Sequence, residues 1–278
     1  MNQLISILIP AHNEAAYIAD CLIALFASQP LPPETSVEVL VLANGCTDDT
    51  ARIAAATVAP QGWDMHVLDL PEGGKLNALN TGDAAAKGDV LIYLDADVLV
   101  EPELIGQIAK ALSSSAALYA SGRPVVASAD SWVTRNYGRF WQKLPFVAQG
   151  VPGFGLFAMT RAGRQRWDQW PDIISDDTFA RLSFTPSERV STSARYQWPM
   201  VEGLANLVRV RRRQNIGVAE IESQFPDLLQ NDEKASLGLS GLLPLALRDP
   251  VGFMVYATVS LLVKTPLFAT KSRWARGR

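Results

Sequence analysis

The first hundred residues of this 278-residue chain alternate short apolar runs with segments of helical periodicity, and no other feature limits the fold as strongly. The predicted strands are four apolar runs at residues 4–9, 37–42, 65–68 and 90–94. The predicted helices cover residues 13–28, 48–58, 75–86 and 101–112. The less regular part that follows predicts strands within 118–126 and helices over 132–144 and 175–182. Since strands that alternate with helices form parallel sheets, we expect an α/β fold with a Rossmann-like, mostly parallel sheet flanked by helices.

The composition excludes several classes of protein. Hydrophobic residues make up 48% of the chain and charged residues 19%, which excludes global disorder and a coiled coil. Two cysteines, Cys21 and Cys46, cannot form a disulfide framework or a structural zinc site. Two histidines, His12 and His66, exclude a histidine-cluster mechanism, so metal chemistry would rest on carboxylates. A net charge of −3 argues against a nucleic-acid-binding protein, and we expect no nucleic-acid partner.

The charge is distributed unevenly, with a basic C-terminal part. Residues 195–278 hold 12 basic and 7 acidic residues, whereas residues 1–194 hold 13 basic and 21 acidic ones. From Pro250 to the end there are five basic residues and no acidic one. This split indicates an acidic body with a basic, surface-seeking end.

The C-terminal part also contains two apolar stretches, 237–247 and 251–263, which predict a helical tail. The second has 13 uncharged residues, whereas a helix that spans a bilayer needs about 20. Pro244 and the pair Asp249-Pro250 interrupt any longer version. The tail is therefore either packed in the core or placed at a membrane surface, and we expect peripheral membrane contact through 237–278.

The N-terminal segment does not read as a signal peptide. It lacks a basic leader, and its apolar run stops at Pro10. Together with the free cysteines, this predicts a cytoplasmic protein that can lie at the inner face of the membrane.

Four polar clusters follow the four predicted strands. They are His12–Glu14, Asn44–Asp49, Gly73–Asn77 and Asp95–Asp97. In open α/β sheets, ligands bind at the carboxyl ends of the strands. Each cluster alone could be an ordinary turn, but four at one edge of a sheet favour a binding site.

Asp95 and Asp97 are the most informative pair, because two carboxylates two residues apart after an apolar strand lie close together at its end. A divalent cation that prefers oxygen ligands would relieve their repulsion and could bridge to phosphates. The alternative is that they cap the helix that begins near Pro102.

These motifs resemble those of inverting family 2 glycosyltransferases with the GT-A fold. The matching segments are Ile9–Glu14, Asn44–Thr50, Gly74–Asn80, Gly88-Asp89, the DxD motif in Leu94–Asp97, and Ser175–Asp177. The resemblance covers about residues 4–185. It implies one GT-A catalytic domain over 1–230, with a nucleotide-binding half at about 1–112 and an acceptor half at about 113–230, followed by an apolar and basic helical tail over 231–278.

The resemblance also implies roles for individual residues. The donor-binding set is Pro10, His12, Glu14, Asn44, Lys75, Asn77 and Asp95. Within it, Asp95 would contact ribose or metal, and Asp97 would ligate Mn²⁺ or Mg²⁺ bound to the diphosphate. Asp177 would be the general base, with Asp176 beside it. Both residues could instead be N-cap residues of the helix that follows.

Two further groups could contact the acceptor or the diphosphate. Gly153 and Gly155 lie in a segment that resembles the family's glycine-rich segment below the acceptor, although such a segment can also be a simple strand bend. Arg212 and Arg213 stand roughly where processive family members have a Gln-x-x-Arg-Trp motif, which is absent here. They could grip a phosphate, or form a solvated or lipid-facing surface. The missing motif favours single transfer over polymerisation.

The resulting interpretation is a metal-dependent, inverting glycosyltransferase of the envelope polysaccharide or glycolipid type. Its donor would be a UDP-, GDP- or dTDP-sugar, and its acceptor a hydroxyl or phosphate on a sugar or lipid-linked molecule. The identity of the donor's nucleobase is left open, because Asn44 replaces the acidic residue that is usual in the family. The alternatives are a nucleotidyltransferase acting on a sugar phosphate and a non-catalytic scaffold with a glycosyltransferase fold.

Overall fold

The computed structural model describes residues 3–29, 31–233 and 238–268. Its centre is an eight-stranded sheet in the order β3-β2-β1-β4-β7-β6-β8-β5. The strands are β1 (Gln3–Ala11), β2 (Thr35–Asn44), β3 (Trp63–Leu70), β4 (Val90–Leu94), β5 (Leu99–Val100), β6 (Tyr119–Val126), β7 (Leu156–Thr160) and β8 (Arg189–Trp198). Strands β1 to β4 are parallel, β7 runs antiparallel to β4 and β6, and β8 is parallel to β6. The predicted α/β class with a mostly parallel sheet is confirmed.

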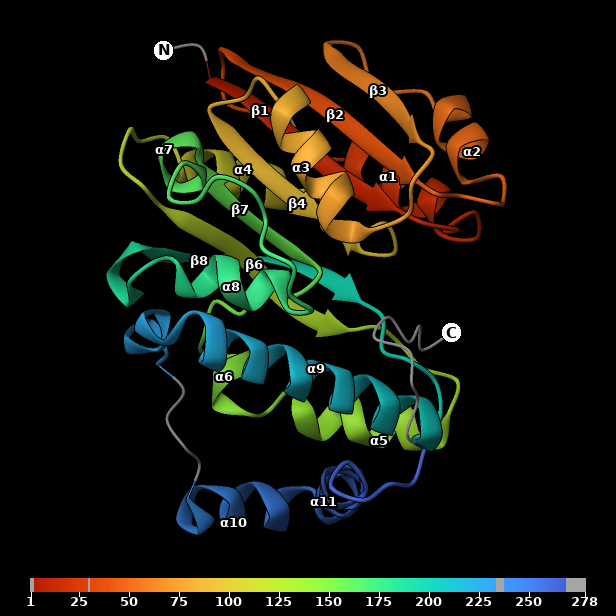
Figure 1. Ribbon diagram of the computed structural model, residues 1–278, viewed down its shortest axis with the longest axis vertical. Helices are drawn as coiled ribbons and strands as arrows, with labels where there is room; N and C mark the ends of the chain where they lie inside the picture. The colour runs from red at the N-terminus through yellow and green to blue at the C-terminus, as the bar shows by residue number, and fades with distance from the viewer. Residues whose placement is uncertain (1–2, 30, 234–237, 269–278) are drawn as a thin grey trace.

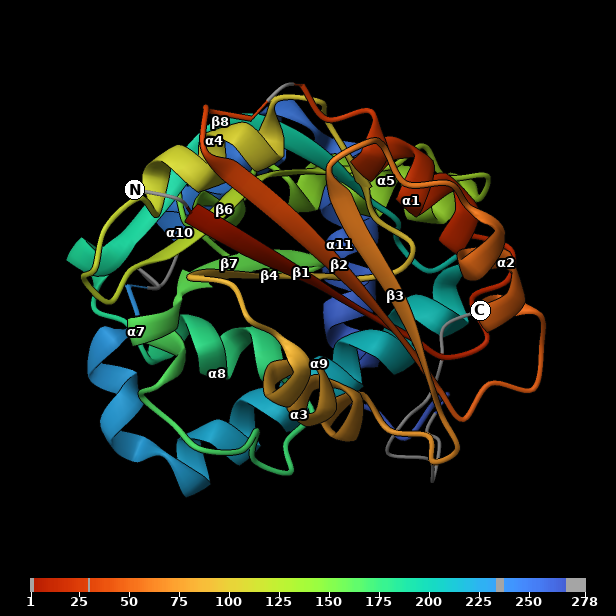
Figure 2. The ribbon, with the colours of Figure 1, turned by 90° about the horizontal axis from the view of Figure 1, so that it is seen from above.

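Helices cover both faces of this sheet (Figures 1 and 2). Those in the first two-thirds of the chain are α1 (Ile18–Phe26), α2 (Thr50–Ala56), α3 (Lys75–Ala85), α4 (Leu104–Ala111), α5 (Trp132–Trp141), α6 (Pro145–Ala148), α7 (Arg161–Arg164) and α8 (Asp176–Leu182). They are followed by α9 (Leu204–Gln224), α10 (Leu239–Arg248) and α11 (Pro250–Leu262), with single 3₁₀ turns at Pro186–Glu188 and Pro226–Asn231. One apolar core joins α1, α2 and α4 to the sheet, and a second joins α3 and α8 to its other face.

The predicted helix over 13–28 begins later than expected. Asn13 adopts a left-handed backbone with φ of 54°, so the helix cannot start there. A hydrogen-bonded turn after Glu14 precedes α1, which starts at Ile18. The residues between β1 and α1 therefore form a loop at the sheet edge, where they can contribute to a site.

A third apolar cluster lies beyond the sheet, among α5, α9 and α11. Tyr256 of α11 lies with its ring centroid 5.6 Å from that of Tyr137 and 5.2 Å from that of Phe140, both on α5. Val259 of α11 is fully buried in the same cluster. In Figure 1, α10 and α11 lie at the end of the molecule farthest from β1 to β3.

Asp249 joins the two C-terminal helices to α5. Its buried carboxylate accepts hydrogen bonds from Arg139 at 2.7 and 2.9 Å and from Lys143 at 2.9 Å, and it caps the backbone of Gly252. These cations hold the pKa of Asp249 below its ordinary value. The expected break at Asp249 is observed, whereas Pro244 lies within α10 and does not end it.

Among the described residues, no helix combines the length and the apolar character that crossing a bilayer requires. The predicted tail covers residues 231–278, of which 234–237 and 269–278 lie outside the part of the chain that is described.

Candidate active site

The four polar clusters meet at the carboxyl ends of β1, β2 and β4 and at the start of α3. They line a cavity of about 630 Å³, called here the donor cavity. Its lining residues are Pro10, His12, Glu14, Asn44, Gly73, Gly74, Lys75, Asp95, Ala96, Asp97 and Arg213. The structure therefore brings together most of the residues that sequence reasoning placed at the donor. Asn77 is exposed on the first turn of α3 and is not among the described lining residues.

Asn44 connects three segments at the edge of the donor cavity. Its amide nitrogen donates to the carbonyls of Ala11, at 2.9 Å, and Leu42, at 3.2 Å. Its amide oxygen accepts from the backbone of Gly74 at 2.9 Å. Since the side chain is almost fully buried, these bonds fix the loop before α3 against the ends of β1 and β2. The need for a donor at this position gives a physical reason for an amide rather than a carboxylate.

The loop after β1 is hydrogen-bonded to the end of β2 and to the residues that follow it. The carbonyl of Asn44 contacts Nδ1 of His12, and the side chain of Asn13 accepts from the backbone of Thr47 at 2.7 Å. The backbone of Glu14 donates to Oγ1 of Thr50 at 2.7 Å. These bonds lock the loops after β1 and β2 together, so the floor of the donor cavity is preformed.

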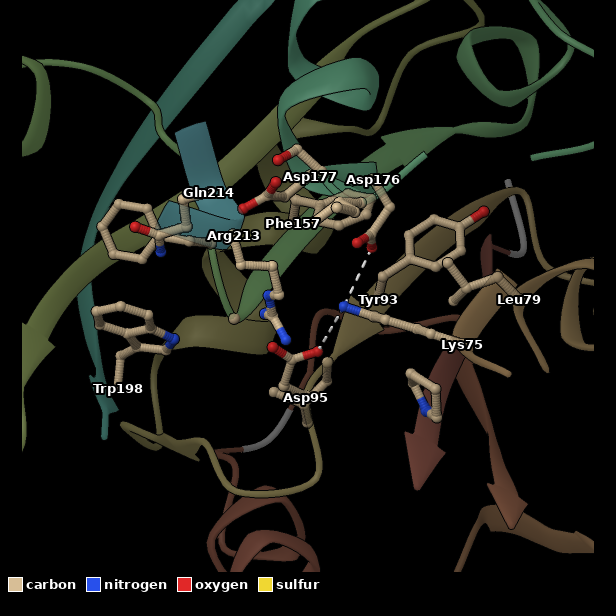
Figure 3. Close-up of a pocket in the computed structure, with 16 residues that line it drawn as sticks. Lys75, Leu79, Tyr93, Asp95, Phe157, Asp176, Asp177, Trp198, Arg213 and Gln214 are labelled. Atoms are coloured by element: carbon tan, nitrogen blue, oxygen red, sulfur yellow. Dashed lines mark hydrogen bonds and ion pairs between the residues drawn. The ribbon is translucent and has the colours of Figure 1, made fainter. Parts of the chain in front are cut away.

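Lys75 lies between two acidic residues from different elements (Figure 3). Its Nζ donates to Asp95 Oδ1 at 3.1 Å and lies 3.1 Å from Asp176 Oδ2. The second contact is an ion pair without hydrogen-bond geometry, since that oxygen accepts no hydrogen bond. Although burial disfavours the ammonium form, the carboxylates of Asp176 and Asp95 raise the pKa of Lys75. It therefore remains a cation at neutral pH.

Asp176 and Asp177 open α8 but face different surroundings. Asp176 points toward Lys75, and its side chain is only 7% exposed. Asp177 Oδ1 accepts from the backbone of Thr178 at 2.6 Å. Withdrawal from water and the neighbouring charge of Asp176 raise the pKa of Asp177 to about 6. A carboxylate with this pKa is suited to take up a proton near neutral pH.

Asp177 lies where two cavities meet. A small central cavity of about 120 Å³ is lined by Lys75, Asp95, Asp176, Asp177 and Arg213 among others. A larger cavity of about 580 Å³, called here the acceptor cavity, also reaches Asp177. It is walled mainly by aromatic and aliphatic side chains, including those of Trp141, Phe146, Phe154, Trp198, Leu242 and Tyr256.

Asp95 and Asp97 can hold a divalent cation only together with other ligands. Both line the donor cavity, and within the described ranges no group of three histidine, cysteine or acidic residues is placed to hold a metal. Magnesium commonly binds through one or two carboxylates plus substrate phosphates and water. The acidic pair therefore fits a cation that arrives with phosphate ligands of its own, and the ammonium of Lys75 lies beside Asp95.

The two adjacent arginines of α9 point to different places. Arg213 lines the donor and central cavities, and Figure 3 shows its guanidinium directed toward Asp95. Arg212 instead donates to carbonyls after and at the end of α11, those of Leu262, Val263, Thr265 and Leu267. Arg212 therefore joins α9 to the C-terminal helix.

Gly153 and Gly155 have positive φ values of 75° and 77°, which favour glycine. A Cβ on Gly155 would lie 2.5 Å from the Trp198 ring, and one on Gly153 would lie 1.8 Å from the Tyr119 hydroxyl. The carbonyl of Gly155 also accepts from the backbone of Asp95 at 2.9 Å. Gly155 thus positions the acidic pair, and it lines the central cavity.

Sequence reasoning missed several residues of the acceptor cavity, including Trp198, Arg181 and Gln214. Trp198 ends β8, where every second residue from Val190 onward is apolar or small. That alternation is a strand signal and could have been found. The other two lie on helices whose orientation depends on tertiary packing.

The mostly parallel sheet, with its antiparallel extension through β7, is the GT-A fold that solved structures of glycosyltransferases share. The sequence profile described as Glycosyl transferase family 2 matches residues 6–184. The chain belongs to this family.

A relative with a described activity is an undecaprenyl-phosphate 4-deoxy-4-formamido-L-arabinose transferase of Aeromonas hydrophila, which is 28% identical over 169 residues, 59% of this chain. The chain spans only part of its curated relatives, 49% of the length of that protein and as little as 18% of another.

Two solved structures share the fold. The mannosyltransferase PcManGT from Pyrobaculum calidifontis, in complex with GDP-Man and Mn²⁺, has a TM-score of 0.58 at 20% identity, covering 95% of this chain and 76% of that one. Glucosyl-3-phosphoglycerate synthase from Mycobacterium tuberculosis, with Mn²⁺ and UDP-Glc, has a TM-score of 0.52 at 21% identity, covering 80% and 78%.

Proposed function

We propose that this protein transfers a sugar from a nucleotide-sugar donor to an acceptor, with inversion at the anomeric carbon. The observation that carries the proposal is the position of Asp177, which lines both the central cavity beside Lys75 and Asp95 and the acceptor cavity. A base at this junction can reach an acceptor oxygen on the side of the sugar away from the diphosphate. Its raised pKa of about 6 suits proton uptake.

The chemical step follows from this placement. The acceptor oxygen forms a bond to the anomeric carbon while the bond from that carbon to the diphosphate oxygen breaks, and its electron pair leaves with the diphosphate. Asp177 takes up the proton of the acceptor hydroxyl. An acceptor phosphate is already ionised and would need no such proton transfer. Because attack and departure occur on opposite sides, the anomeric configuration inverts.

The donor cavity would hold the nucleoside diphosphate. Asp97 and Asp95 would ligate Mn²⁺ or Mg²⁺, while Lys75 and Arg213 would contact diphosphate oxygens. When bound, the cation offsets the negative charge that develops on the leaving diphosphate. The solved complexes of PcManGT with GDP-Man and of the mycobacterial synthase with UDP-Glc, both with Mn²⁺, support a metal-assisted nucleotide-sugar donor.

The acceptor would be a sugar or a lipid-linked molecule used in envelope polysaccharide or glycolipid synthesis, on the cytoplasmic side of a membrane. The aromatic walls of the acceptor cavity suit the apolar face of a sugar ring or a lipid segment. The relative from Aeromonas is named for transfer to undecaprenyl phosphate. We assign residues 1–230 to catalysis, with halves at 1–112 and 113–230, and 231–278 to a helical tail.

The test is nucleoside diphosphate release from UDP-, GDP- and dTDP-sugars with Mn²⁺, with wild-type protein and Asp97→Asn compared. The proposal predicts release from one nucleotide class, lost with chelator and reduced about a hundredfold or more in the variant. Asp89→Asn, which changes a carboxylate that contacts the backbone of Leu4, serves as the matched control. Formation of a nucleotide sugar from a sugar phosphate, without transfer, would support the nucleotidyltransferase alternative. Absence of release from every donor would favour the scaffold.

A further inference from the structure

The outward sides of α10 and α11 carry a row of large exposed apolar side chains. This outer apolar face consists of Leu243, Leu247, Val251, Met254 and Leu261. Leu247 is 74% exposed and Met254 is 68% exposed. The four-residue spacing on α10 and the three- and seven-residue spacings on α11 place each set on one side of its helix. Each of the two helices therefore carries its exposed apolar side chains along one side, and they are not scattered around the helix.

The opposite sides of the same helices are packed. Phe253 and Tyr256 contact the ring of Phe140 on α5, and Val259 is fully buried. Arg212 of α9 donates to the carbonyls at the end of α11, and Asp249 pairs with Arg139 and so connects the start of α11 to α5. Because both ends and the inner side of α11 are held, rotation that would bury the outer apolar face is blocked.

The charges around this face are positive. Arg248 and Lys264 are exposed at either end of α11, while the acidic residue between them, Asp249, is buried and paired. In sequence, residues 250–278 hold five basic residues and no acidic one. A second copy of the chain on this face would bring like charges together. An anionic lipid surface matches both the apolar row and the cations.

The same helices also line the acceptor cavity. Leu242 of α10 and Tyr256 of α11 contribute to its wall, which Asp177 also lines. One side of α10 and α11 thus borders the cavity that contains Asp177, and the other side is exposed to solvent.

We propose that the outer apolar face of α10 and α11 docks on an anionic lipid bilayer and so places the acceptor cavity beside the lipid. The docking itself stands on the exposed row and its charges, whereas the delivery of an acceptor from the bilayer rests on the proposed function. The helices lie along the surface and do not cross it.

The test is co-sedimentation of the full chain with vesicles of phosphatidylcholine alone or mixed with phosphatidylglycerol. The wild-type protein should bind the mixed vesicles, bind the neutral ones far more weakly, and be released as salt rises. The double variant Leu247→Glu/Met254→Glu should lower the partition coefficient by about tenfold or more, because it places two carboxylates in the apolar row. The matched control Ile23→Glu/Val58→Glu changes two exposed apolar residues of the donor side and should bind as the wild type does.

Three results would overturn the docking proposal. They are absence of wild-type binding to mixed vesicles, equal loss in both double variants, and a wild-type dimer that the outer-face variant converts to a monomer without any vesicle binding. Calorimetric titration with nucleotide sugar and Mn²⁺ is run on the same proteins. Unchanged donor binding in the outer-face variant supports separate docking and catalytic surfaces. Absence of donor binding in the wild type would contradict the proposed function and leave the vesicle result to decide docking.

Discussion

Apart from Arg213 of α9, the polar residues of the donor cavity end or follow parallel strands or begin the helix after one. The walls of the acceptor cavity come instead from α5, α6, α8, α9, α10, α11, the end of β8 and the segment before β7. On the donor side, hydrogen bonds between neighbouring loops fix the geometry, as with Asn44 and the backbone of Gly74. On the acceptor side, packing between helices fixes it, as with Tyr256 against Phe140. We therefore expect changes on one side to leave binding on the other largely intact.

The largest expected effect is that of Asp177→Asn, which should lower the transfer rate and leave donor binding intact. The amide cannot take up a proton, so transfer to an acceptor hydroxyl should fall by about a thousandfold, within the range for general base catalysis. Donor affinity should change little, because the carboxylate lies at the acceptor end of the central cavity. Steady-state transfer rates and calorimetric donor titration measure the two quantities.

Asp168→Asn is the control for Asp177→Asn, since it changes an exposed carboxylate. Equal transfer rates in Asp177→Asn and the wild type, with an acceptor that offers only hydroxyl groups, would contradict the assignment of the base.

On the donor side, Asn44→Asp should destabilise the fold by about 1–3 kcal/mol. A carboxylate cannot donate to the carbonyls of Ala11 and Leu42, and it would leave them facing a negative charge. Chemical denaturation measures the free energy of unfolding. If the variant has wild-type stability and prefers a different nucleobase, Asn44 instead contacts the nucleobase and determines its selection.

On the acceptor side, Asp249→Ala should cost about 1–2 kcal/mol of stability, because it removes an N-cap together with the ion pairs to Arg139 and Lys143. The lowered pKa of Asp249 means that its stabilising contribution is present above the ordinary carboxyl pKa and is lost as pH falls through the folded-state value. Wild type and variant should therefore converge in stability at strongly acidic pH. Donor affinity near neutral pH should be unchanged, and its loss would break the proposed independence of the two sides.

The smallest effect concerns the pH profile. With a pKa of about 6, Asp177 is ionised above that pH, so the transfer rate should decline as pH falls below about 6. Asp176→Asn removes a negative charge that raises this pKa, and the acidic limb should move to lower pH, which increases the relative rate at pH 5 by several-fold. An unchanged limb would indicate that another group controls it.

The strand-end clusters were predictable because a residue that follows a parallel strand can lie only at one edge of the sheet. The positions that depend on helix rotation were not. Arg212 and Arg213 are adjacent, yet about 100° of helical rotation sends one to the end of α11 and the other to the donor cavity. The sequence did not reveal which arginine faces inward, because this depends on how α9 packs against α5 and α11.

The strands in the second half of the chain show a different limit of prediction from sequence. β7 and β8 were not predicted, although β7 joins β4 to β6 and β8 joins β6 to β5. β7 is buried throughout and apolar up to Thr160, and such a short run cannot be distinguished from a helix segment by periodicity. The start of α1 was predicted too early because the left-handed backbone of Asn13 depends on its bonds to the next loop.

The central claim is that the donor cavity binds a nucleotide sugar through a cation held by Asp97 and Asp95. Calorimetric titration of UDP-, GDP- and dTDP-sugars into the wild-type protein, with Mn²⁺ and then with chelator, tests it most directly. We predict binding of one nucleotide class with Mn²⁺, loss of that binding with chelator, and the same loss in Asp97→Asn with Mn²⁺ present. Binding of equal affinity in all three conditions would contradict the claim.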